Sequence, residues 1–230
     1  MQEPTQRLFF ALWPTGPQQR QMTEATRARV SAAGGRPVPE RDLHVTLAFL
    51  GSVPQRRVRE LAGIAAQAAR HARNNPAAGG AVANECAESA EHVRTAPVRL
   101  TFARTEYWRK AQILCAVGDP IEASVVAGDA SGRISPGSSA DDAAMLRAAA
   151  LAAELQRGLS AAGFSPDLKP FRAHVTLARK VHLAQADAAF AAVTWSFSEL
   201  ALIDSRTEAG GSSYSVVDRW ALCADSAPKR

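Results

Sequence analysis

The chain has 230 residues, of which 47% are hydrophobic, and this suits one large globular domain or two small lobes. Its net charge of +5 comes mostly from arginine, whose planar guanidinium suits phosphate oxygens, although genomic base composition alone can also enrich arginine. Three widely spaced cysteines and the lack of a long apolar stretch argue against a disulfide framework and a membrane span. We therefore expect a protein of the reducing cytoplasm.

The first third of the chain alternates strands and helices. Residues 7–13 have the pattern of a buried strand, and residues 15–33 that of a helix ended by a glycine pair. A proline-containing loop then leads to a strand over 42–50, which Gly51 is expected to close. The apolar spacing over 54–73 predicts a second helix.

Two segments of the middle region have the composition of insertions. Residues 74–94 contain Asn-Asn-Pro and Gly-Gly without hydrophobic periodicity, and residues 127–139 are rich in Gly and Ser. Between them, residues 98–104 and 111–117 have the pattern of a strand hairpin. We interpret the two segments as loops within a single bilobal domain spanning 1–230, rather than as lids or partner sites.

The last third repeats the order of the first. The expected elements are a helix over 141–163, a strand over 171–179, a short helix over 183–190, and strands over 194–205 and 214–222. Each half thus places a strand between two helices and continues into further strands. This indicates an internal duplication of the architecture, although the sequence similarity between the halves is faint.

The most informative feature is the tetrapeptide His-Val-Thr-Leu, which occurs at residues 44–47 and again at residues 174–177. Because side chains alternate along a strand, the histidine and the threonine of each copy share one face. A lone histidine is most often a hydrogen-bonded structural residue. A second copy in an equivalent strand, in a chain with only five histidines, favours a catalytic role. The two strands would then form the two walls of one cleft.

This pair of motifs suits displacement at phosphorus. A neutral imidazole removes a proton from the attacking oxygen, and a protonated imidazole gives a proton to the departing oxygen. Two hydroxyls donate hydrogen bonds to the remaining phosphate oxygens. The candidates are His44 and His174 for proton transfer, with Thr46 and Thr176 as phosphate ligands. Motifs typical of zinc hydrolases, of serine or cysteine hydrolases and of ATP-binding loops are missing from the sequence.

The sequence resembles the two-histidine phosphoesterase superfamily, and more narrowly the RNA 2′,3′-cyclic phosphodiesterases first described as RNA 2′,5′ ligases. The matching segments are Arg-Leu-Phe-Phe-Ala-Leu-Trp-Pro at 7–14, Leu-His-Val-Thr-Leu-Ala-Phe-Leu-Gly at 43–51, His-Val-Thr-Leu-Ala-Arg at 174–179, and a closing pattern of Ser205, Gly211, Tyr214 and Trp220. These segments come from both halves of the chain. The separation between the two motifs is longer than in the compact family pattern.

The resemblance implies an α+β fold, bilobal with pseudo-two-fold symmetry, in which two antiparallel sheets with flanking helices enclose a central cleft. It also implies hydrolysis of RNA 2′,3′-cyclic phosphate ends to 2′-phosphates without a metal or other cofactor, with His44 as the proton donor and His174 as the proton acceptor. Thr46, Thr176 and Arg179 would hold the phosphate. Strict alternation puts Arg179 on the face opposite His174, so a bulge or strand end must turn it inward.

Several alternatives stay open at this level. The same chemistry could act on a small cyclic nucleotide, an ADP-ribose cyclic phosphate or a 2′,5′-linked oligonucleotide, and a binding module for RNA or nucleotides could keep the cleft without turnover. Phe10 and Phe49 could stack on a base, but we interpret both as core residues. We expect a monomer without membrane association, whose partners are RNA with 2′,3′-cyclic phosphate ends or cyclic nucleotides.

Overall fold

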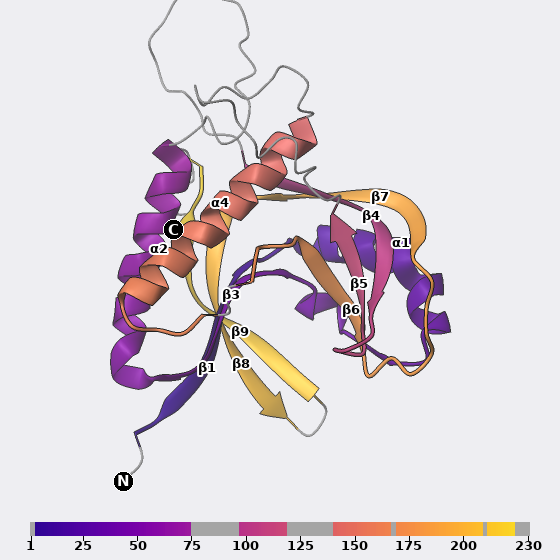
Figure 1. The fold of residues 1–230 in the computed structure, drawn as a ribbon, viewed down its shortest axis with the longest axis horizontal. Helices are drawn as coiled ribbons and strands as arrows, with labels where there is room; N and C mark the ends of the chain where they lie inside the picture. Colours follow the sequence, from indigo (N-terminus) through magenta and orange to yellow (C-terminus); the bar gives the residue numbers. More distant parts are fainter. Residues whose placement is uncertain (1–2, 75–96, 119–139, 167–168, 209–210, 224–230) are drawn as a thin grey trace, which may run out of the picture.

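The computed structural model of the protein describes residues 3–74, 97–118, 140–166, 169–208 and 211–223. The insertion-like segments expected at 74–94 and 127–139 lie outside these ranges, apart from residue 74 itself. The described part has an α+β fold of two antiparallel sheets with helices packed against them (Figure 1). No helix in this part of the chain is long and apolar enough to cross a membrane.

The described residues form nine strands and three α-helices. The strands are β1 Thr5–Leu12, β2 Arg36–Pro37, β3 Val45–Pro54, β4 Val98–Trp108, β5 Ile113–Gly118, β6 His174–Arg179, β7 Ala188–Phe197, β8 Glu199–Glu208 and β9 Gly211–Ala221. The helices are α1 Gly16–Ala32, α2 Val58–Asn74 and α4 Ala140–Ala161, with short 3₁₀ turns at Glu40–Asp42 and Gln55–Arg57.

The two His-x-Thr strands belong to different sheets. The first sheet has the strand order β3-β1-β8-β9, and the second has the order β2-β6-β5-β4-β7. Strand β3, which carries the first motif, is thus an edge strand, whereas β6, which carries the second, lies between β2 and β5. Strands β3 and β6 contact one another where the two sheets meet. This contact brings the two motifs together.

A shared apolar core holds both motif strands in place. Val45 and Val175, which stand between the histidine and the threonine of each motif, are both completely buried in it. Full burial of an aliphatic side chain of this kind is worth about 1.5–3 kcal/mol, so each strand is firmly anchored by its apolar face. Helices α2 and α4 lie side by side, whereas α1 packs against β6 and β7 of the second sheet (Figure 1).

The helix ends follow the chemistry of their flanking residues. At the start of α1, the side-chain oxygen of Gln18 accepts hydrogen bonds from the backbone N–H and the hydroxyl of Thr15, at 2.9 and 3.0 Å. Gly34 and Gly163, which follow α1 and α4, have φ angles of 63° and 74°. Glycine adopts this left-handed conformation without a steric penalty, so both helices end at the positions that the sequence predicts.

Two predictions for the last third are wrong. The alanine-rich segment 183–190 is not a helix: residues 180–187 form a loop, and β7 begins at Ala188, which pairs with Thr105 of β4. Pairing across the sheet has overridden the helix propensity of alanine. The single strand expected over 194–205 is in fact two strands, because the chain leaves the second sheet at Ser198 and enters the first.

The boundaries of the motif strands also differ from expectation. Strand β3 begins at Val45 rather than at residue 42, and it runs through Gly51 to Pro54. Gly51 bends the strand with a φ of 69° but does not end it. Strand β6 begins at His174 itself, three residues later than expected. Each histidine therefore stands at the junction of a loop and a strand.

Candidate active site

A β-bulge follows each His-x-Thr pair. In β3 the register against β1 skips Leu47, and in β6 the register against β5 skips Leu177. Each extra residue shifts the side chains that follow by one position, so Phe49 and Arg179 return to the face of the histidines. The inward turn that the family resemblance requires for Arg179 is therefore present.

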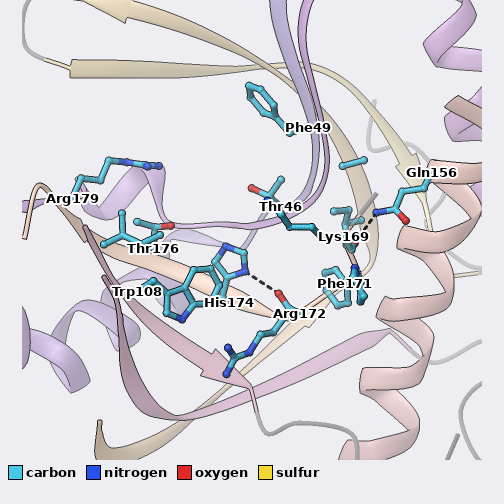
Figure 2. Close-up of a pocket in the computed structure, with 14 residues that line it drawn as sticks. Thr46, Phe49, Trp108, Gln156, Lys169, Phe171, Arg172, His174, Thr176 and Arg179 are labelled. Carbon is cyan, nitrogen blue, oxygen red and sulfur yellow. Dashed lines mark hydrogen bonds between the residues drawn. The ribbon is translucent and has the colours of Figure 1, made fainter. Parts of the chain in front are cut away.

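The two motifs border a cavity of about 730 Å³ (Figure 2). Four of the five predicted site residues line it: Thr46 comes from β3, and His174, Thr176 and Arg179 come from β6. The fifth, His44, is not part of its described lining and lies directly before β3. The structure thus gathers the predicted threonines, the arginine and one histidine around a single space, with the other histidine beside it.

The two phenylalanines considered for base stacking differ in their environment. Phe10 is completely buried in the core, as expected. Phe49 is 38% exposed and lines the cavity, so the interpretation of Phe49 as a core residue is wrong. The bulge at Leu47 explains the error, because it moves Phe49 from the buried face of the strand to the open one.

His44 is fixed at both ring nitrogens. Its Nδ1 lies 2.7 Å from the backbone oxygen of Asp42, so this nitrogen carries a proton and donates it. In the neutral ring Nε2 is then an acceptor, and it lies 3.2 Å from the hydroxyl of Thr46. Because Thr46 lines the cavity, this hydroxyl connects the imidazole to the space between the motifs.

Three aromatic side chains enclose the ring of His44. Trp13 stacks on it with an interplanar angle of 8° and 5.2 Å between ring centroids, while Phe9 and Tyr214 lie at 4.9 and 5.3 Å. Burial among these rings lowers the pKa of His44 to about 4, against the smaller opposite effect of the Asp42 carbonyl. His44 is therefore neutral at neutral pH in the free protein.

His174 has a similar anchor and a different neighbour. Its Nδ1 lies 2.8 Å from the backbone oxygen of Arg172, and its ring lies 4.6 Å from that of Trp108. Burial lowers the pKa of His174, and the charges of Arg172 and Arg179 act in the same direction. Both imidazoles thus donate to a backbone carbonyl through Nδ1, which leaves Nε2 as the unprotonated nitrogen of the neutral ring.

The wall beside His174 is held by Glu106. Its carboxylate accepts hydrogen bonds from the indole nitrogen of Trp108 at 3.1 Å and from the guanidinium of Arg172 at 2.6 Å. Arg104 forms a further ion pair with it at 3.1 Å. The guanidinium of Arg172 also lies 5.5 Å from the centre of the Trp108 ring. These contacts fix the orientation of the tryptophan against the histidine.

The thiol beneath the cavity is not suited to nucleophilic chemistry. Cys115 of β5 pairs with Thr176 and is hydrogen bonded to its side chain. Burial raises the pKa of Cys115 to about 12, so the thiol stays protonated. Among the described residues, no three His, Cys, Asp or Glu side chains gather in a way that could hold a metal ion.

Sequence reasoning missed the aromatic residues that touch the histidines. Phe9 and Trp13 are an even number of positions apart in the strand predicted over 7–13, so the period of two predicts a shared face for them, but not the contact of that face with His44. Tyr214 belongs to the last segment that matches the family, but that match does not say which residue it contacts. Trp108 gave no signal, because the predicted strand stopped at residue 104 and β4 continues to 108.

A family model described as LigT-like phosphoesterase matches residues 12–78 and 140–214, which include both motifs. A search of curated protein sequences found no match.

Solved structures with the same fold include that of a phosphoesterase, at 22% identity and a TM-score of 0.65, which covers 95% of this chain and 99% of the other. Escherichia coli LigT in complex with NADP⁺ is also 22% identical, with a TM-score of 0.64 and coverage of 96% and 99%. The complex of the same protein with 3′-AMP gives 22% identity, a TM-score of 0.62 and coverage of 95% and 99%. Since the family model matches more than half of the residues, the chain belongs to the LigT-like phosphoesterases of the two-histidine phosphoesterase superfamily.

Proposed function

We propose that the protein hydrolyses the 2′,3′-cyclic phosphate end of RNA to a 2′-phosphate by paired histidine catalysis that needs no metal. One observation carries this proposal: strands from two different sheets bring the same His-x-Thr group to the border of one cavity, which Arg179 also lines. A cyclic phosphodiester suits such a site, because a proton donor, a proton acceptor and phosphate ligands are sufficient to open a strained ring.

In the proposed reaction His174 is the base. Its lowered pKa keeps the imidazole unprotonated at neutral pH, and the contact of Nδ1 with the Arg172 carbonyl leaves Nε2 to accept a proton from water. The water oxygen forms a bond to phosphorus while the bond between phosphorus and the 3′ oxygen breaks. The product therefore keeps its phosphate on the 2′ oxygen.

His44 supplies the proton that the departing 3′ oxygen needs. Because the pKa of His44 is about 4 in the free protein, its acid form has to be created when the substrate binds. The negative charge of a phosphate next to the ring stabilises the imidazolium and raises that pKa. The division of roles between His44 and His174 rests on the family resemblance, since both rings are held by the same kind of carbonyl contact.

The remaining site residues hold the substrate. Thr46 and Thr176 donate their hydroxyls to the non-bridging oxygens, and Arg179 provides charge-assisted hydrogen bonds to the same phosphate. Phe49 presents a partly exposed ring in the same cavity, on which the terminal base can stack. The complexes of Escherichia coli LigT with NADP⁺ and 3′-AMP support a nucleotide as the ligand.

The test uses an RNA oligonucleotide with a 2′,3′-cyclic phosphate end and separates the products by chromatography, next to standards with a 2′- and a 3′-phosphate. We expect the 2′-phosphate as the product, at the same rate with EDTA as without it. A 3′-phosphate product, a requirement for added metal, or no turnover at all would contradict the proposal. A cyclic mononucleotide, assayed in parallel, tests the alternative substrate class.

A further inference from the structure

The cavity extends beyond the groups that the proposed chemistry uses. Its other end is lined by Gln156 of α4 and by the segment 169–172, which precedes β6. Figure 2 shows Gln156, Lys169 and Phe171 together, on the far side of His174 from Arg179 in this view. We call this part, lined by Gln156, Lys169, Pro170 and Phe171, the upstream end of the cavity.

The upstream end is built on one side of the site only. The matching segment of the first half, which precedes His44, forms the 3₁₀ turn Glu40–Asp42 and is not part of the described lining of the cavity. Both motifs place a threonine in the lining of the cavity, but only the segment that precedes the second motif extends it further. A substrate that fills the whole cavity must therefore extend into the upstream end, beyond the nucleoside that carries the cyclic phosphate.

The side chains of the upstream end match the parts of a nucleotide. Lys169 provides a compact cation for a phosphodiester, and Phe171 provides a partly buried ring for a base. The side-chain nitrogen of Gln156 donates to the backbone oxygen of Lys169 at 3.4 Å, which ties the segment to α4. Pro170 between them fixes its own φ and restricts the backbone of Lys169.

Arg172 has a different task. Its guanidinium is paired with Glu106 and lies over Trp108, so it is held beside His174 rather than at the upstream end. We assign the contact with the substrate to Lys169, which is exposed and lines the upstream end itself.

We propose that the upstream end is a subsite for the nucleotide that precedes the cyclic end, so that the preferred substrate is an RNA chain rather than a cyclic mononucleotide. This inference rests on the proposed function. Lys169 binds the phosphodiester between the last two nucleotides, and Phe171 stacks on the penultimate base. A cyclic mononucleotide occupies the phosphate end and leaves these two contacts unmade.

The experiment compares kcat/KM for a trinucleotide with a 2′,3′-cyclic end and for the cyclic mononucleotide with the same terminal base. We expect the wild-type protein to prefer the trinucleotide, and we expect Lys169→Ala and Phe171→Ala each to reduce this preference about tenfold. Lys110→Ala is the matched control, because it removes the same charge from an exposed turn away from the cavity lining. The preference should also weaken with added salt in the wild type, and less so in Lys169→Ala.

Each result decides one of the two proposals. Equal effects of Lys169→Ala on both substrates, or no preference in the wild type, would overturn the subsite. If the wild type turns over neither substrate, the proposed function fails, and binding then tests the subsite separately. In that case a trinucleotide with a 2′-phosphate end should bind Lys169→Ala more weakly than wild type, and equal affinity would refute the subsite. Thermal unfolding of each variant confirms that it is folded.

Discussion

The two His-x-Thr strands have the same sequence over five residues and very different surroundings. Each histidine donates through Nδ1 to the carbonyl two residues earlier, and each motif continues into a bulge. His44, however, is enclosed by three aromatic rings, whereas His174 has one tryptophan and the charges of Arg172 and Arg179 near it. Repetition of the strand thus fixes which ring nitrogen is bound to a carbonyl, while the neighbours from other strands set how readily the other nitrogen takes a proton.

A second difference lies directly after the bulges. At the equivalent position the first motif has Phe49 and the second has Arg179, and both side chains line the cavity. One wall therefore offers an apolar ring and the other a charge. This comparison predicts a division between base binding and phosphate binding.

The largest expected effect comes from removing either imidazole. His44→Ala and His174→Ala should each lower kcat on a cyclic phosphate end about 10²–10⁴-fold, because each removes one proton-transfer group. Single-turnover rates at saturating substrate measure this loss. Thr46 and Thr176 remain, so both variants should still bind the substrate. Near-wild-type turnover in one variant would show that the two motifs do not act as a pair.

Replacing the residue that follows each bulge, Phe49 or Arg179, is expected to lower activity less than removing a histidine does. Arg179→Ala should reduce kcat/KM about 10–100-fold whatever the terminal base, since a charged hydrogen bond is worth about 1.5–3 kcal/mol. Phe49→Ala should mainly raise KM, and more for purines than for pyrimidines, because it removes a stacking surface. Steady-state kinetics with substrates of all four terminal bases separate the two patterns. If both variants respond to the base in the same way, the proposed division of the walls is wrong.

The stability of the protein should depend on pH through His44. Its pKa is about 4 in the folded state and about 6.5 in an unfolded chain, so between these values the unfolded chain binds the proton. The contribution of His44 is thus fully present above pH 6.5 and is lost as the pH falls toward 4, by up to about 3 kcal/mol. Urea unfolding at pH 7 and pH 4.5 measures this. His44→Gln should lose less stability than wild type over this range, and an unchanged loss would contradict the aromatic burial of His44.

The smallest expected signal is the proton taken up when an anion binds. Since burial lowers the pKa of both histidines, an anion in the cavity should raise these pKa values and draw in a fraction of a proton near pH 6. Titration calorimetry with sulfate, in two buffers of different ionisation enthalpy, detects this uptake. His44→Gln and His174→Gln then show which ring receives the proton. Heats that do not depend on the buffer would argue against substrate-dependent protonation.

The sequence was sufficient for the parts of the fold that depend on local pattern. Residues 15–33 have end signals of their own and residues 54–73 have apolar spacing, and the structure has the helices α1 Gly16–Ala32 and α2 Val58–Asn74 in these segments. The structure of the segment 183–190, in contrast, depends on its partner. Its alanines favour a helix in isolation, but pairing with β4 makes part of it a strand. The passage at Ser198 from one sheet to the other was hidden for the same reason, because an apolar run does not reveal which partner each part of it meets.

The candidate site was predictable as a set of residues but not as an arrangement. The repeated motif identified Thr46, Thr176 and the two histidines; three of them line one cavity, and His44 contacts its lining through Thr46. The bulges were not predictable from the sequence, because they depend on pairing with β1 and β5. Phe49 was therefore assigned to the wrong face of its strand.

The pair of bulges also settles a question of direction. A cleft whose two walls are identical accepts a ligand equally well after a half-turn about the axis between them. In this protein the five shared residues of each motif keep that ambiguity, and the sixth removes it, with Phe49 on one wall and Arg179 on the other. This pair of side chains thus adds a polarity that the shared motif residues lack, so that a bound ligand meets an apolar ring on one wall and a charge on the other.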